Sequence, residues 1–78
     1  MITPAPSASR IKRYAAEAAA AHDVEPADVM GTARTVALVQ ARWAMWKRLS
    51  DEGFSIASIA RAFGRHHTTV LYALRKVG

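Results

Sequence analysis

Residues 55–77 read SIASIARAFGRHHTTVLYALRKV, and this stretch decides the fold. Ser55 can cap a short amphipathic helix, because a serine hydroxyl accepts from the free N–H groups of a first turn. The apolar residues of this helix recur at helical spacing: Ile56, Ile59, Ala60 and Phe63. Gly64 then turns the chain, and a final helix is predicted from residues 65–66 onward. Two short helices joined by a tight glycine turn form a helix-turn-helix.

The sequence before this stretch predicts two N-terminal helices. The first is expected to start at Ser9, capped by Ser9 or by Ser7, and to end near His22. Pro26 suits the first position of a second, short helix, where its missing N–H costs nothing. Gly31 is expected to end that helix with a positive φ.

A third helix is predicted from residues 32–34 to residues 51–53. Apolar residues lie on most of its faces, which is typical of a helix at the centre of a bundle. Trp43 and Trp46 occupy its most apolar stretch and are expected to pack in the core. They could otherwise form a stacking platform for single-stranded bases.

These elements predict an all-α fold, a compact bundle of about five helices with a C-terminal helix-turn-helix. Residues 1–8 contain two prolines among small residues and are expected to form a flexible arm. Residues 9–78 are expected to form a single helix-turn-helix domain.

Length and composition exclude several classes of protein. The 78 residues are too few to hold both an NTPase core and a recognition module. The absence of cysteine excludes a disulfide scaffold and a thiolate zinc site, and it fits a cytoplasmic location. His22, His66 and His67 are not expected to bind a metal, because adjacent side chains on a helix diverge by about 100°.

The positive charge is concentrated after residue 29. Eleven Lys and Arg residues oppose six Asp and Glu residues, a formal net charge of +5. Residues 30–78 hold eight of these cations and two of the acids, a net charge of +6, and no acid follows Glu52. A basic segment without carboxylates indicates a polyanionic partner, although a solvated basic surface has the same charge pattern.

The final helix has two different faces. The apolar stripe that should face the core consists of Val70, Ala73, Leu74 and Val77. The opposite face carries cations, hydroxyls and one phenol: Arg65, Thr68, Thr69, Tyr72, Arg75 and Lys76. Cations suit phosphates, and threonine can contact a base by its hydroxyl or its methyl group. The face therefore predicts a DNA-recognition helix, with an ordinary solvated amphipathic helix as the alternative.

Residues 63–73, FGRHHTTVLYA, closely resemble the signature of the bacterial replication initiator DnaA family. The C-terminal DNA-binding domain of that family carries Phe-Gly-Gly-Arg-Asp-His-Thr-Thr-Val at this place. Ala41-Arg42 and Ala44-Met45 look like its Ala-Arg-Gln-x-Ala-Met stretch, with an offset of one residue. Arg34 looks like the arginine of its basic loop. One glycine of the family turn is missing, and His66 stands where the family has aspartate.

The resemblance implies roles for individual residues. The base contacts it implies are His67, Thr68 and Thr69, with His66 at the position of the family aspartate and therefore a changed preference at one base. Arg65 is expected at the DNA backbone and Arg34 in the adjacent minor groove. Arg42 is expected to contact a phosphate or to be a structural ion partner. Apart from the resemblance, further backbone or groove contacts are expected from Ser55, Tyr72, Arg75 and Lys76.

The ATPase portion of the initiator is not represented, since no Gly-x-x-x-x-Gly-Lys-Ser/Thr loop occurs. The chain is expected to be a free-standing regulator or a piece of something larger, with no enzymatic activity and no cofactor. The expected partner is double-stranded DNA, bound by a monomer in the nucleoid of the cytoplasm, with no nucleotide or membrane. RNA polymerase or another regulator is an open further partner.

The function expected from the sequence is sequence-specific DNA binding by a small transcription regulator. One alternative is a replication-associated protein that binds or competes for initiator sites. A second is a protein-interaction module that binds no DNA.

Overall fold

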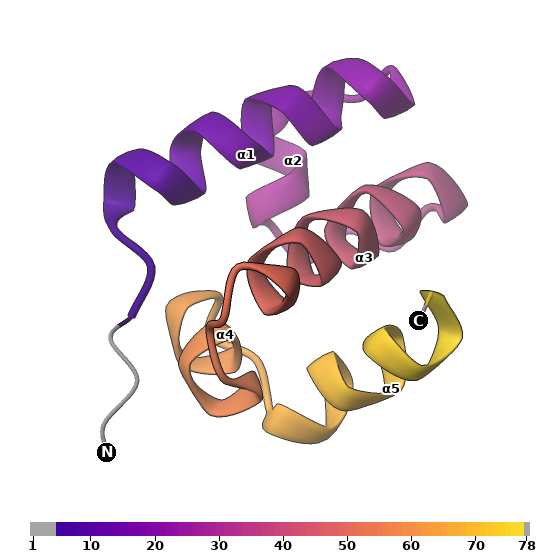
Figure 1. Ribbon diagram of the computed structural model, residues 1–78. Helices are drawn as coiled ribbons and strands as arrows, with labels where there is room; N and C mark the ends of the chain where they lie inside the picture. The colour runs from indigo at the N-terminus through magenta and orange to yellow at the C-terminus, as the bar shows by residue number, and fades with distance from the viewer. Residues whose placement is uncertain (1–4, 78) are drawn as a thin grey trace.

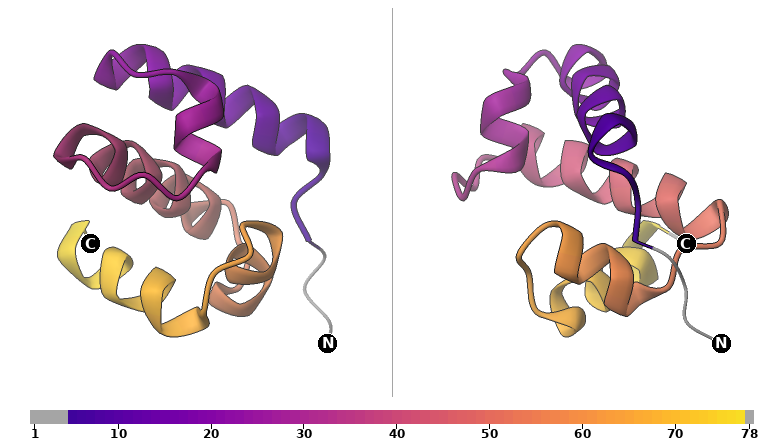
Figure 2. Two further views of the ribbon diagram at one scale, coloured as in Figure 1. Left: turned by 180° about the vertical axis from the view of Figure 1, so that it is seen from behind. Right: turned by 90° about the vertical axis from the view of Figure 1, so that its left-hand side faces the viewer.

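The computed structural model describes residues 5–77, which form five α-helices and no strands. The helices are α1 (Ala8–His22), α2 (Pro26–Met30), α3 (Val36–Asp51), α4 (Ile56–Ala62) and α5 (His67–Val77). Figure 1 shows α3 between α1 on one side and the α4–α5 pair on the other, and Figure 2 shows the same order from behind. The all-α fold with a C-terminal helix-turn-helix is confirmed.

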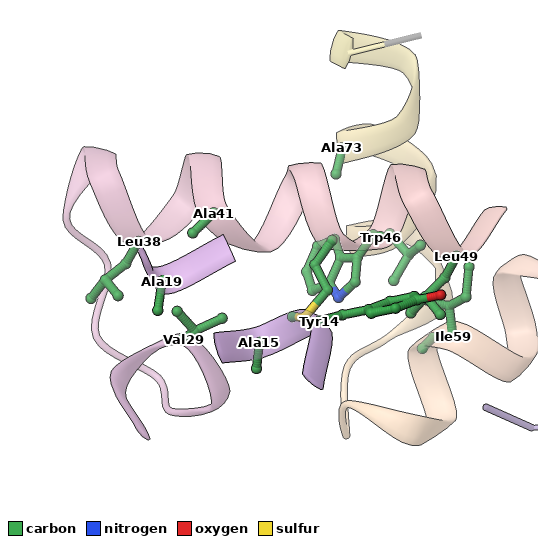
Figure 3. Close-up of a cluster of buried hydrophobic side chains, with 13 residues drawn as sticks. Tyr14, Ala15, Ala19, Val29, Leu38, Ala41, Trp46, Leu49, Ile59 and Ala73 are labelled. Carbon is green, nitrogen blue, oxygen red and sulfur yellow. The ribbon is translucent and has the colours of Figure 1, made fainter. Parts of the chain in front are cut away.

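α3 is the central helix because it contacts all four others, as its many apolar faces predict. Trp46, Leu49 and Ala41 on α3 are buried, and Tyr14 from α1 and Ile59 from α4 pack with them in one core (Figure 3). The core therefore joins the N-terminal helices to the helix-turn-helix.

Side-chain caps fix where α1, α3 and α4 begin. Ser7 caps α1, Thr35 caps α3 and Ser55 caps α4, each by accepting from the backbone N–H three residues later. The cap by Thr35 starts α3 at Val36, later than the predicted start at residues 32–34. Residues 31–35 are therefore a loop, and this loop carries Arg34 to the surface.

The predicted flexible arm falls partly on residues 1–4, which lie outside the described residues. Within the rest of that segment, Pro6 is buried, Ser7 caps α1 and Ala8 begins the helix.

A Schellman turn joins α4 to α5. The Arg65 N–H donates to the Ala60 carbonyl at 2.8 Å, and the Gly64 N–H donates to the Arg61 carbonyl at 3.3 Å. Gly64 has a φ of 63°, the left-handed conformation that this motif requires. One glycine is thus sufficient for the turn. Gly31, in contrast, has a φ of −85°, so the predicted positive φ at Gly31 is wrong.

Candidate nucleic-acid interface

The turn that opens α5 is exposed and is ordered by its own side chains. The His66 carbonyl accepts from the Thr69 N–H at 3.0 Å. The His66 Nδ1 atom accepts from the Thr68 N–H at 3.3 Å, so the imidazole takes the place of an N-cap side chain. The ring centroids of His66 and His67 lie 4.5 Å apart. The predicted recognition helix therefore begins at His67, slightly later than residues 65–66, with His66 as its cap.

The outer face of α5 is exposed as the sequence predicts. Val70 and Ala73 are fully buried, whereas Thr68 and Thr69 are exposed and Tyr72 is 56% exposed. The Tyr72 ring meets Trp43 of α3 edge-on, with centroids 6.0 Å apart. The Lys76 Nζ lies 5.3 Å from the Tyr72 centroid, which brings a cation over the phenol ring.

A groove lies between α3, the start of α5 and the loop that carries Arg34. Its volume is about 430 Å³. The residues that line it are Arg34, Val39, Arg42, Trp43, Trp46, Arg65, Thr68, Thr69 and Tyr72. Three of these nine side chains are cationic and none is acidic. The groove can therefore accept an anionic group beside the hydroxyls of the recognition helix.

Arg42 is buried, with 4% of its surface exposed. Its Nε donates to the Val29 carbonyl at 2.8 Å, and its Nη2 donates to the carbonyls of Asp28 at 2.8 Å and Gly31 at 2.9 Å. Burial lowers the pKa of Arg42 from its ordinary value, and the charges of Arg65 and Arg34 lower it further. The guanidinium nevertheless keeps its proton at any physiological pH.

These contacts give Arg42 a structural role. Its Nε and Nη2 donors are directed at carbonyls at the end of α2, so Arg42 anchors the loop after α2. This role is one of the two that the sequence predicts, with carbonyl oxygens as partners in place of an acidic side chain, and the phosphate contact stays a prediction.

Arg65 connects the helix-turn-helix to the same loop. Its Nη2 donates to the Gly31 carbonyl, which also accepts from Arg42. The shared carbonyl holds the turn before α5 against the loop that carries the exposed Arg34. Arg34 and the first turn of α5 thus line one groove.

Comparison with known families agrees with this arrangement. The model of the bacterial DnaA protein helix-turn-helix matches residues 11–77, nearly the whole chain. The chain belongs to the bacterial DnaA helix-turn-helix family. No curated protein sequence matches the chain significantly.

Membership in the DnaA helix-turn-helix family implies binding to double-stranded DNA, and the DnaA helix-turn-helix is not a catalytic domain. In residues 5–77, no cluster of three or more His, Cys, Asp or Glu side chains could hold a metal ion. None of the helices described for this DnaA-type domain is long and apolar enough to cross a membrane.

The structure gathers only some of the predicted site residues around the groove. Those around the groove are Arg34, Arg42, Arg65, Thr68, Thr69 and Tyr72. Those outside its lining are Ser55, His66, His67, Arg75 and Lys76. Arg75 and Lys76 are exposed on the last turn of α5, beyond the groove. The Ser55 hydroxyl accepts from the Ser58 N–H at 3.1 Å and donates to the Ser58 Oγ at 3.0 Å. Most of the hydrogen-bonding capacity of this hydroxyl is therefore used in the cap of α4.

Trp43 is a groove residue that sequence reasoning assigned to the core. Trp46 is buried as expected, but Trp43 is only half-buried and lines the groove beside Tyr72. Its neighbour three positions away, Trp46, points into the core because α3 has different partners on its different faces. The aromatic wall of the groove therefore depends on how α5 packs on α3, where Tyr72 meets Trp43.

Proposed function

We propose that this DnaA-family chain binds double-stranded DNA sequence-specifically and acts as a small transcription regulator. The start of α5 enters the major groove, where Thr68, Thr69 and the two histidines meet base edges. The observation that carries the proposal is the acid-free groove in which Arg34 and Arg65 flank the threonines of α5. Hydroxyls and cations beside one another suit bases and phosphates respectively.

The loop after α2 supplies the second contact in this proposal. Arg34 is exposed, lies ahead of α3 and lines the same groove as Thr69. The hydrogen bonds to the Gly31 carbonyl fix this loop relative to α5. Arg34 can therefore reach the minor groove next to the major-groove segment read by α5. This arrangement lets one copy of the domain read an asymmetric site.

In vitro selection of the preferred DNA site tests the proposal. The wild-type protein should enrich one asymmetric motif from random duplexes. Thr69→Ala should weaken discrimination within that motif by about 1–3 kcal/mol, the usual value of a good base contact. Ser9→Ala is the matched control, because Ser9 is an exposed hydroxyl on α1, away from the groove. Equal effects of the two substitutions would contradict a base contact by Thr69.

The salt dependence of affinity tests the backbone contacts separately. The logarithm of the association constant should fall by about 0.9 for each tenfold rise in salt per phosphate neutralised. Arg75→Ala should make this slope shallower and weaken specific and non-specific binding alike. An affinity that did not change with salt would rule out the phosphate contacts.

A replication-associated role is the second candidate, and the unbroken His67–Val70 segment of the DnaA signature favours it. The selected motif separates the candidates. Enrichment of the site that DnaA itself binds would support competition at initiator sites, whereas a different motif would support a separate regulator. If no motif were enriched, a protein-interaction module would become the better explanation.

A further inference from the structure

The hydrogen bonds of His66 determine which nitrogen of its neutral imidazole carries the proton. Nδ1 accepts from the Thr68 backbone N–H at 3.3 Å and lies 2.7 Å from the Thr68 Oγ1. The hydrogen of a backbone amide has a fixed position, so a second hydrogen on Nδ1 would point at it. Nδ1 is therefore unprotonated, and the hydrogen of the neutral ring is on Nε2.

One further feature favours the same tautomer. The N-terminus of an eleven-residue helix carries a partial positive charge, which favours a lone pair directed at it over an N–H. The Thr68 hydroxyl, 2.7 Å from Nδ1, can donate to the bare nitrogen and is compatible with this tautomer. The remaining nitrogen, Nε2, makes no hydrogen bond within residues 5–77 and belongs to an exposed side chain.

We propose that His66 is a specificity-determining residue that presents a hydrogen-bond donor to DNA, and that it selects a base with acceptors on its major-groove edge. Guanine offers N7 and O6 there and thymine offers O4, whereas cytosine offers the N4 donor. The inference rests on the proposed sequence-specific binding. The inference specifies which bases the proposed binding selects: guanine or thymine is preferred over cytosine at the base that His66 meets.

Nitrogen NMR of the free protein tests the tautomer without DNA. Long-range proton–nitrogen correlations recorded at pH 8 distinguish the protonated from the bare ring nitrogen. The expected result is a bare Nδ1 and a protonated Nε2 at His66. The opposite tautomer at His66 would overturn the proposal.

Two variants of equal shape test the base preference at the same pH. His66→Asp and His66→Asn can both cap α5 with a side-chain oxygen, and both are good N-cap residues. With one oxygen used in the cap, Asp presents a second acceptor, whereas Asn presents its amide donor. Because the two side chains have the same reach, a difference between the variants reports the donor or acceptor character and not the length of the side chain.

In vitro selection with the wild type and both variants gives the outcome. The wild type and His66→Asn should prefer guanine or thymine over cytosine at one position by about fivefold or more, and His66→Asp should reverse that preference to cytosine. An enriched wild-type motif that all three proteins share at every position would overturn the role of His66 and leave the proposed function intact. Failure of the wild type to enrich any motif would overturn both. Far-UV circular dichroism of each variant confirms that the helices are retained.

Discussion

Replacing Arg42 by methionine is expected to destabilise the domain strongly, although the residue lies beside the candidate DNA interface. The change removes a buried guanidinium and its three hydrogen bonds to the carbonyls of Asp28, Val29 and Gly31. Two of these carbonyls keep another partner: the Asp28 carbonyl accepts from the Gly31 N–H, and the Gly31 carbonyl accepts from Arg65. The Val29 carbonyl loses the partner that Arg42 provides.

The expected loss of stability follows from the three lost hydrogen bonds and from the one carbonyl, that of Val29, that is left without a partner. A hydrogen bond from a charged donor contributes about 1.5–3 kcal/mol, and a buried carbonyl left without a partner costs about 1–3 kcal/mol. The methionine recovers part of the loss by filling the apolar part of the site. We therefore expect Arg42→Met to lower the free energy of unfolding by about 2–4 kcal/mol. Stabilities near 0.05–0.15 kcal/mol per residue give about 4–12 kcal/mol for a chain of this size, so the loss is a large fraction of the total.

Urea unfolding followed by circular dichroism measures the change, with Arg61→Met as the matched control. Arg61 is an exposed arginine of α4, so its replacement should change the free energy of unfolding by less than about 0.5 kcal/mol. Arg42→Lys separates a structural role from a phosphate contact. Lysine keeps the charge but cannot reproduce the planar fork that reaches three carbonyls, so it should also destabilise the domain. Full stability of Arg42→Lys together with a loss of DNA affinity in Arg42→Met would refute the reasoning.

Three further predictions address the turn, an ion pair and the basic loop. Gly64→Ala should lower the free energy of unfolding by about 1–2 kcal/mol because φ is 63°, whereas Gly31→Ala, at φ −85°, should change it little; urea unfolding compares them. The hydrogen bond from the Tyr14 hydroxyl lowers the pKa of Glu52 most, and Arg10 lowers it further. The Glu52 carboxylate therefore stabilises the fold at neutral pH, and this stabilisation is lost as the pH falls below about 4. Acid titration of wild type and Glu52→Gln should therefore show a weaker acid dependence in the variant. Arg34→Ala should weaken DNA binding in a filter or anisotropy assay, and a normal affinity would exclude Arg34 from the interface.

Local signals explain what could be predicted from the sequence. Ser55 caps α4 because a serine hydroxyl can reach the N–H three residues on, whatever the rest of the chain does. Gly64 takes the left-handed conformation because the Schellman motif needs it at that position. The burial of Val70 and Ala73 on α5 follows from the helical period alone, whereas Val77, predicted on the same stripe, is 41% exposed. Each of these features depends on residues that are close together in the chain, so it can be predicted from the sequence without knowing how the helices pack.

Contacts between distant segments explain what could not be predicted. The burial of Arg42 depends on where the carbonyls of α2 point, 11 to 14 residues earlier in the chain. The exposure of Trp43 depends on how α5 crosses α3. The tautomer of His66 depends on the start of α5 at His67, and the sequence predicts the start of that helix only to within one or two residues. Helical periodicity predicts which face of a helix is apolar, but not which of several neighbours will cover it.

The structure also changes how the positive charge should be interpreted. Lys47 donates to Asp51 at 2.7 Å, and Arg48 donates to Glu17 at 3.0 Å, so both lie in ion pairs away from α5. Arg42 is used inside the fold. The cations proposed to face DNA lie on α5 or around the groove, and Arg65 among them also holds the loop of Arg34 through the Gly31 carbonyl. Arg65 therefore both faces the groove and holds the loop of Arg34 near α5. The net charge of residues 30–78 exceeds the number of cations available for the proposed phosphate contacts. Because Arg65 serves both purposes, the proposed contacts of Arg34 and of α5 depend on each other.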